Sequence, residues 1–180
     1  MPLFSRQSAA YARTLGLPIH FVHLLLAVED KRFPVHPGID PLAALRALWA
    51  DLRSGSASQG GSTIAQQLFD VEGRWGTTRD RTLARKLRQS VWAVGASLRS
   101  SKSAILRRYL NAMYWGQQIY GIDAAARWYC DTDRQNLTAA QSFFLVDRIA
   151  APNSAFPGRI SELLSRPTIA QALASGLTPV

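Results

Sequence analysis

Apolar residues recur every three or four positions along almost all of this 180-residue chain, and this spacing limits its fold more than any other feature. The spacing matches the 3.6-residue period of an α-helix, and no run of useful length alternates with the two-residue period of a strand. Hydrophobic residues make up 47% of the chain, enough for a substantial core rather than a disordered segment. We therefore expect a mainly α-helical, globular single domain over residues 1–180.

Local signals place several helices within this pattern. A first helix is expected over residues 18–30, and Asp40 is a suitable cap for the next one, which starts at Pro41. Thr63 and Thr138 each stand three residues before a glutamine, the spacing of a capping box, so further helices begin directly after them. Two apolar stripes, which we expect to be buried, define helices between these points: Leu83, Leu87, Val91, Val94 and Leu98 in one, and Ile105, Leu106, Tyr109, Leu110, Met113 and Tyr114 in the other.

The net charge of +9 is concentrated in one part of the chain. Residues 74–108 contain ten basic side chains and the single acid Asp80. Such a block attracts polyanions, including nucleic acid, anionic lipid headgroups and phosphorylated substrates. A solvated helix face has the same composition, so the block alone does not decide between these classes.

Other features narrow the classes of function. Cys130 is the only cysteine, so no internal disulfide forms. His20 and His23 share a helix face, but no third ligand accompanies them, so the sequence indicates no metal site. No stretch of the chain approaches the ~18 apolar residues of a membrane-spanning helix.

A first polar cluster, with Glu29, Asp30, Phe33 and His36, directly follows the apolar run 24–28. Burial beside such a run raises the pKa of a carboxyl group, and a base with a pKa nearer to neutrality abstracts protons better. Glu29 is therefore a candidate general base. An ordinary helix C-terminus with paired surface acids would show the same pattern.

Two further clusters suit an anionic ligand. Gly60 stands before a predicted helix start, where main-chain N–H groups and the helix dipole favour negative charge. Ser62, Thr63 and Gln67 add polar groups there, and the missing Gly-Lys-Ser/Thr ending excludes a nucleotide P-loop. In the third cluster, the adjacent bases Arg85 and Lys86 can neutralise a diphosphate, which the arginine can grip with two hydrogen bonds.

Together and in this order, five blocks between about residues 21 and 157 resemble glycosyltransferase family 51. This family comprises the monofunctional transglycosylases and the matching module of class A penicillin-binding proteins. The blocks are Glu29-Asp30-x-x-Phe33-x-x-His36-x-Gly38-Ile39-Asp40; Gln59-Gly60-Gly61-Ser62-Thr63-Ile64-x-Gln66-Gln67-Leu68; Arg85-Lys86; Ser101-Lys102-x-x-Ile105-Leu106-x-x-Tyr109-Leu110-Asn111 with Tyr114 and Gly116; and Gly121-x-x-x-Ala125-Ala126-x-x-Tyr129.

The resemblance implies a lysozyme-like helical fold with a substrate cleft, in which lipid-linked disaccharide-pentapeptide is polymerised into glycan strands. Glu29 matches the catalytic glutamate that deprotonates the acceptor 4-hydroxyl, whose oxygen attacks the donor anomeric carbon with inversion while the polyprenyl diphosphate leaves. The residues that the resemblance implies in substrate binding are Asp30, Phe33, His36, Gly60, Ser62, Thr63, Gln66, Gln67, Arg85, Lys86, Lys102 and Asn111.

The resemblance also implies a location at the outer, periplasmic face of the plasma membrane. The implied partners are the lipid-linked precursor, the growing glycan chain, the membrane surface and other cell-wall synthesis proteins, but no nucleic acid. The stripe of Leu45, Leu48, Trp49 and Leu52 lies where the family has a membrane-dipping segment, although plain core packing is equally compatible. The usual N-terminal anchor is not visible in this sequence, and a divalent cation, magnesium or manganese, is a family expectation.

The chain departs from the family at two charged positions. The third block of the family ends in a second functional glutamate, where this chain has Gln89, and a family lysine that contacts the diphosphate is replaced by Asp70. Glutamine keeps hydrogen bonding but bears no charge, and it removes a potential metal ligand. If each change removes about 2–3 kcal/mol of transition-state stabilisation, the reaction slows on the order of a thousandfold. A family aromatic–glycine pair also appears as Cys130 and Asp131.

Three other functions stay open at this point. One is a catalytically degenerate module that binds the precursor or acts as a cell-wall scaffold, which Gln89 and Asp70 favour. Another is a lysozyme-like hydrolase that uses water as acceptor, against which the basic cluster argues. The last is a basic nucleic-acid binder, for which no motif is present.

Overall fold

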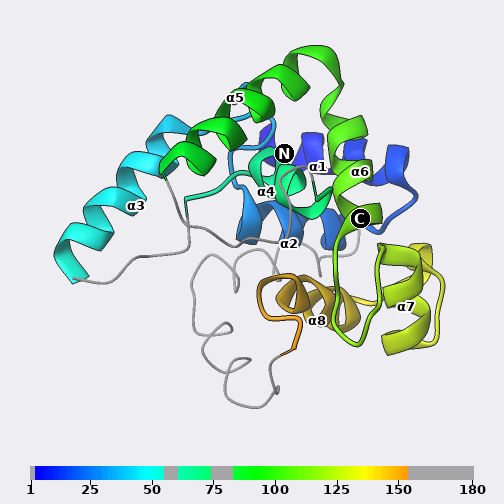
Figure 1. Cartoon of the computed structure of the whole chain (residues 1–180). Coiled ribbons are helices and arrows are strands. Elements are labelled where there is room, and N and C mark those ends of the chain that lie inside the picture. Colours follow the sequence, from blue (N-terminus) through cyan, green and yellow to red (C-terminus); the bar gives the residue numbers. More distant parts are fainter. Residues whose placement is uncertain (1–2, 55–60, 74–82, 154–180) are drawn as a thin grey trace. The chain divides into compact units, whose positions relative to one another are not determined.

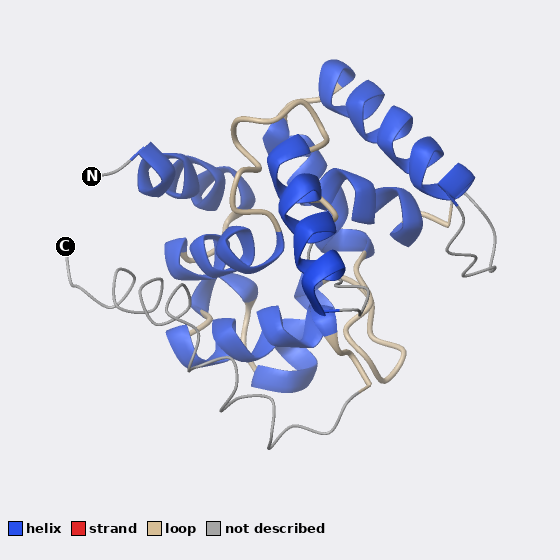
Figure 2. Ribbon diagram, turned by 90° about the vertical axis from the view of Figure 1, so that its left-hand side faces the viewer, coloured by secondary structure: helices blue, strands red, loops and turns tan. Residues whose placement is uncertain are grey.

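The computed structural model describes residues 3–54, 61–73 and 83–153, and its regular structure within these ranges is helical, without a strand (Figures 1 and 2). The helices are α1 (Leu3–Leu15), α2 (Ile19–Glu29), α3 (Pro41–Ser54), α4 (Ile64–Val71), α5 (Leu83–Arg99), α6 (Lys102–Ala112), α7 (Ile122–Cys130), the 3-10 helix η1 (Arg134–Asn136) and α8 (Ala139–Ala150). An isolated antiparallel bridge joins Tyr114 and Tyr120. The mainly α-helical fold expected from the sequence is confirmed.

The chain packs as two compact units. One unit comprises Met1–Val28 with Leu110–Val180, and the other comprises Glu29–Tyr109. The second unit contains the first three sequence blocks and Lys102 of the fourth, so the candidate site lies in it. The single domain predicted over residues 1–180 stays a prediction.

The first unit is built around α2 and Arg148. Five successive or nearly successive side chains of α2 are buried: Phe21, Val22, Leu24, Leu25 and Leu26. α7 packs against η1 and α8. The buried guanidinium of Arg148, on α8, donates to the main-chain carbonyls of Trp115 and Pro152 and to the hydroxyl of Tyr129. These bonds satisfy a charged group that would be costly to bury alone.

Helix starts agree with the local signals in the sequence. The carboxylate of Asp40 accepts hydrogen bonds from the main-chain N–H groups of Leu42 and Ala43 at the start of α3. Thr63 and Thr138 form complete capping boxes with the glutamines three residues later. The sequence does not predict α1, because some of the side chains that this helix buries are small and no strong apolar stripe runs along it.

α4 and α5 pack against each other in the second unit. Phe69 of α4 contacts the ring of Trp92 of α5, with 5.7 Å between their centroids. The side chain of Gln66 does two jobs: its oxygen accepts from the N–H of Thr63, and its nitrogen donates to the hydroxyl of Ser90 across the interface. One buried glutamine thus caps α4 and joins it to α5.

The buried apolar stripe predicted on α5 is wrong. Leu87, Val91 and Leu98 are exposed, the last by 77%, and Val94 is only half-buried; the side chain of Leu83 lies outside the described residues. α5 instead buries the face that carries Gln89 and Ala93. The physical reason is that this face makes polar bonds to α4, and Ala93 is small enough for the backbone of the loop before α3 to approach closely. Periodicity identifies the apolar face but not which face is packed.

By contrast, the buried stripe predicted on α6 and the residues after it is confirmed for Ile105, Leu106, Tyr109, Leu110 and Met113, with Tyr114 half-buried.

The apolar face of α3 is exposed, which contradicts core packing for the residues described there. Leu42, Leu45 and Trp49 are exposed by 55%, 63% and 58%. The side chains of Leu48 and Leu52 lie outside the described residues. A helix face of this kind, uncovered by its own unit, is available to another apolar phase.

No single helix among the described residues is long and apolar enough to cross a membrane. The segments Arg6–Leu15 and Ile19–Glu29 meet that test only as a pair, which is bent by 116°.

Substitution of Gly38 by alanine should destabilise the second unit. Gly38 has a φ of 101°, and a Cβ atom there would lie 2.2 Å from the main-chain oxygen of Ala93 in α5. Because a backbone atom cannot move aside cheaply, we expect the free energy of unfolding to fall by about 2–4 kcal/mol in urea denaturation.

Gly73→Ala is the matched control for this prediction. Gly73 also has a positive φ, of 62°, but a Cβ atom added there would meet no atom within 4 Å. Only backbone strain remains there, about 1 kcal/mol. Equal losses in the two variants would contradict the close approach at Gly38.

Candidate active site

Glu29 lies at the C-terminal end of α2 and is half-buried. Its Oε2 accepts a hydrogen bond of 2.9 Å from the side-chain amide of Gln67, on α4. The oxygen of the same amide accepts a 2.7 Å hydrogen bond from the hydroxyl of Tyr109, on α6. The three side chains form a relay, Tyr109 to Gln67 to Glu29, that holds the carboxylate in one orientation.

The direction of this relay depends on the protonation of Tyr109, which is fully buried. Burial raises the pKa of the Tyr109 hydroxyl well above its ordinary value, and the negative charges of Glu29 and Asp30 raise it further. The hydroxyl therefore stays protonated at neutral pH and donates to Gln67. The sequence predicts Tyr109 as a buried residue of a helix stripe and as a member of the fourth family block, and its part in the relay comes from the structure.

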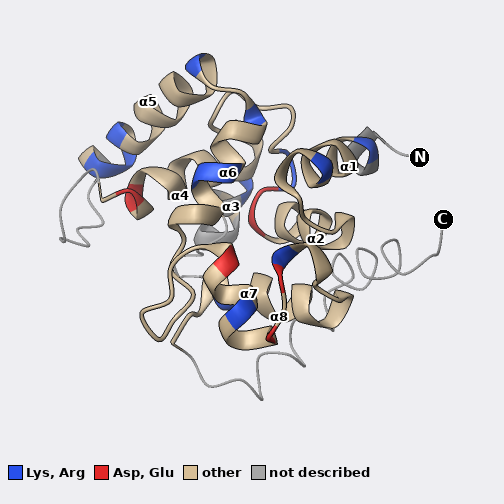
Figure 3. Ribbon diagram, turned by 90° about the vertical axis from the view of Figure 1, so that its right-hand side faces the viewer, with Lys and Arg blue, Asp and Glu red and all other residues tan. Residues whose placement is uncertain are grey.

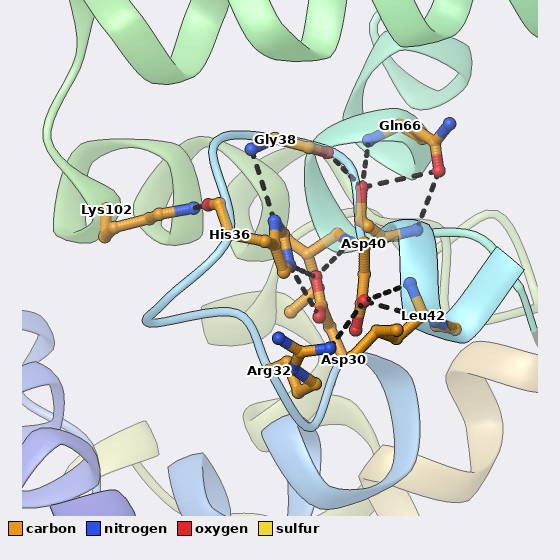
Figure 4. A network of polar contacts seen from close by, with 11 residues as sticks. Asp30, Arg32, His36, Gly38, Asp40, Leu42, Gln66 and Lys102 are labelled. Carbon is orange, nitrogen blue, oxygen red and sulfur yellow. Dashed lines mark hydrogen bonds and ion pairs between the residues drawn. The ribbon is translucent and has the colours of Figure 1, made fainter.

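Asp30 is the centre of a buried polar network (Figure 4). Nε2 of His36 donates to both carboxylate oxygens, at 2.8 and 3.0 Å, and the main-chain N–H of Ile64 donates to one of them at 3.0 Å. Nδ1 of His36 accepts from the N–H of Gly38, which indicates that the ring proton is on Nε2. The carboxylate thus ties the loop after α2 to the first residue of α4.

Lys102 and Phe33 support the same loop. The ammonium group of Lys102 donates to the main-chain carbonyl of His36 at 2.6 Å (Figure 4). It also lies 4.6 Å from the centroid of the Phe33 ring, which is buried. Burial lowers the pKa of Lys102, and the charge of Asp30 opposes this shift. These contacts show both side chains holding the loop, and their contact with substrate stays a prediction.

The second block divides into buried and accessible residues. Thr63 and Gln66 are buried, and the hydroxyl of Thr63 donates to the main-chain carbonyl of Gly38 at 2.6 Å. Ser62 is half-buried and accepts a 2.7 Å hydrogen bond from the ammonium group of Lys86. Gly60 lies outside the described residues. Ser62, with Lys86 beside it, is therefore better placed than Thr63 to meet a ligand.

The two charged positions where the sequence departs from the family are in contact. The side-chain amide of Gln89, buried on α5, donates to the carboxylate of Asp70 on α4, and a nitrogen of Arg85 forms an ion pair of 2.7 Å with the same carboxylate. Figure 3 shows this acidic end of α4 beside the basic start of α5. Burial lowers the pKa of the neighbouring Lys86, whereas the charge of Asp70 raises it and that of Arg85 lowers it further.

The remaining predictions concern Asn111 and a metal ion. Asn111 belongs to the other unit and is exposed. Among the described residues, no three His, Cys, Asp or Glu side chains come together as metal ligands. The carboxylate of Asp70 already accepts bonds from Arg85 and Gln89, and the divalent cation stays a prediction.

Comparison with known proteins agrees with the sequence blocks. A family model described as Transglycosylase matches residues 3–171. Penicillin-binding protein 1F of Bacillus subtilis (strain 168) is 36% identical over 141 residues, which is 78% of this chain and 19% of that protein. Penicillin-binding protein 1B of Vibrio cholerae is 37% identical over 162 residues, 88% of this chain and 20% of that protein.

Penicillin-binding protein 1A of Escherichia coli (strain K12) is 36% identical over 141 residues, 78% of this chain and 16% of that protein. The chain thus spans at most a fifth of the length of these three relatives. The match to the family model, in contrast, covers nearly the whole chain. This chain therefore belongs to the transglycosylase family.

Proposed function

We propose that this chain is a peptidoglycan glycosyltransferase module, which polymerises lipid-linked disaccharide-pentapeptide into glycan strands with inversion at the anomeric carbon. The observation that carries the proposal is the relay from Tyr109 through Gln67 to Glu29, which orients one carboxylate in a chain of the transglycosylase family. A carboxylate fixed in this way can act as a general base on a hydroxyl group.

In this reaction Glu29 takes the proton of the acceptor 4-hydroxyl. The acceptor oxygen then forms a bond to the anomeric carbon of the donor, while the bond from that carbon to the diphosphate breaks on the opposite face. The bonding electrons leave with the diphosphate, whose charge Lys86 and Arg85 stabilise. Asp30, His36 and Lys102 contribute by holding the loop that follows Glu29, and no step requires them to touch the substrate.

A second candidate function is a module that binds the precursor without polymerising it, as a degenerate scaffold. The ion pair between Arg85 and Asp70 favours it, because an arginine engaged by an internal carboxylate is less available to a leaving diphosphate. The two candidates differ only in turnover, so a polymerisation assay separates them.

We also propose that the exposed apolar face of α3 rests on the membrane at its outer, periplasmic face, where the lipid-linked precursor and the growing glycan lie. Trp49 presents its ring there, and the guanidinium of Arg53 lies 3.7 Å from the ring centroid. An aromatic ring with a nearby base suits an interface with anionic headgroups. We expect other cell-wall synthesis proteins as further partners, as the family resemblance implies.

Replacing Glu29 by glutamine should abolish polymerisation. The amide keeps the shape of the side chain but cannot accept the acceptor proton, so we expect the rate to fall at least about a hundredfold. Lipid-linked precursor in detergent, with polymer separated by gel electrophoresis, is the assay. The control is Asp133→Asn, the same change at an exposed ion pair with Arg127 in the other unit, which should leave the rate unchanged.

If the parent chain makes polymer and the Glu29→Gln variant makes it at the same rate, Glu29 is not the general base. No polymer from the parent, with binding of the precursor retained, would establish the binding module instead. Release of fragments from finished glycan strands would reveal a hydrolase.

Replacing Trp49 by serine should weaken binding to vesicles that contain phosphatidylglycerol. Loss of the exposed ring removes apolar area from the proposed contact, and we expect the partition coefficient to fall about tenfold in vesicle sedimentation. Trp128→Ser is the matched control, since Trp128 is exposed to a similar extent, by 65%, but lies on α7 of the other unit. Equal losses in both variants would show that α3 is not the membrane-facing surface.

A further inference from the structure

The carboxylate of Asp70, on α4, already accepts bonds from two side chains of α5. Arg85 and Gln89 are one helical turn apart on α5, and both reach this single carboxylate, Arg85 at 2.7 Å. The amide of Gln89 is buried, and the side chain of Arg85 is 21% exposed. An external anion that uses Arg85 must therefore compete with a group that is attached to the protein.

The charge of Asp70 also reaches Lys86, the other base of the third block, where it raises the pKa against the effect of burial. The ammonium group of Lys86 itself donates a 2.7 Å hydrogen bond to the hydroxyl of Ser62, which precedes α4. One fixed negative charge thus offsets part of the positive charge of two adjacent bases. The local field that would attract a phosphate group is correspondingly weaker.

We propose that Asp70 is a specificity-determining residue, an internal carboxylate that holds Arg85 and Gln89 and thereby weakens the binding of diphosphate groups at the start of α5. The inference rests on the proposed function only in treating Arg85 and Lys86 as diphosphate ligands. The diphosphate can be free or attached to a lipid, and binding without turnover tests the inference in either case.

Asp70 and Gln89 also depend on each other. The amide is a good partner for the carboxylate, because it donates a hydrogen bond without adding charge. Gln89→Glu alone would place two carboxylates in contact and should weaken diphosphate binding further. Gln89→Glu together with Asp70→Lys replaces the contact between an amide and a carboxylate by a pair of opposite charges and places a cation at position 70, so the double variant should bind more tightly than the parent.

The test is isothermal titration calorimetry on the full chain with two probes, inorganic pyrophosphate and farnesyl diphosphate. Asp70→Asn keeps the size of the side chain and removes its charge, so we expect Kd to fall about tenfold. Asp70→Ser repeats the test with a smaller side chain. The matched control is Glu72→Gln, which removes a charge two residues away where the carboxylate faces Arg108 rather than Arg85.

A gain confined to the Asp70 variants, and lost again in Asp70→Asn with Arg85→Gln, supports the proposal. No gain from Asp70→Asn, or an equal gain from Glu72→Gln, overturns it. A gain with both probes assigns the effect to the diphosphate alone, whereas a gain with farnesyl diphosphate only assigns it to the lipid-linked form.

These outcomes stay distinct from those of the proposed function. Tighter diphosphate binding in variants that make no polymer would retain this inference and reject the glycosyltransferase. Polymerisation that depends on Glu29, together with diphosphate binding that does not change in the Asp70 variants, would support the glycosyltransferase and reject this inference.

Discussion

The buried carboxylate of Asp30 is the interaction on which the candidate site depends. Only 6% of Asp30 is exposed, and a carboxylate buried to this extent needs several hydrogen-bond donors. Its two oxygens accept hydrogen bonds from the ring of His36, and one of them also accepts from the main-chain N–H of the first residue of α4. Because Asp30 follows Glu29 directly, these bonds also limit where Glu29 can lie. Lys102 reinforces the arrangement by holding the carbonyl of His36. The position of the proposed base thus follows from a neighbour that is itself inaccessible.

Two kinds of polar residue are therefore mixed within the same sequence blocks. Thr63, Gln66 and His36 are buried, and their hydrogen bonds hold the loop and the start of α4. Glu29 and Ser62 are half-buried and lie at the borders of this framework. A motif match treats all of these positions alike. Burial distinguishes the residues that hold the loop and the helix in place from the residues that are accessible to a ligand.

The sequence predicts what depends on neighbouring residues and misses what depends on packing. The caps at Asp40, Thr63 and Thr138 are correct because each bond spans only two or three residues. The stripe with Leu87, Val91 and Leu98 is a true apolar face, but the prediction that it is buried is wrong. The reason is that α5 packs against α4 through its other face. Likewise, Glu29 and Gln67 stand 38 residues apart, and no local pattern pairs them.

The contact of Asp70 with Gln89 shows why fold and chemistry can diverge at one site. Packing of α4 on α5 requires that the buried amide of Gln89 find an acceptor, and Asp70 supplies one. A lysine at position 70 paired with a glutamate at position 89 would also form a bonded contact between the two helices, with the donor on α4 and the acceptor on α5. Either pair can join α4 to α5, but the two pairs present different charges to a diphosphate. Changes at positions 70 and 89 can alter the field at Arg85 and Lys86 while the helices stay in place, provided that the buried side chain at position 89 keeps a hydrogen-bond partner.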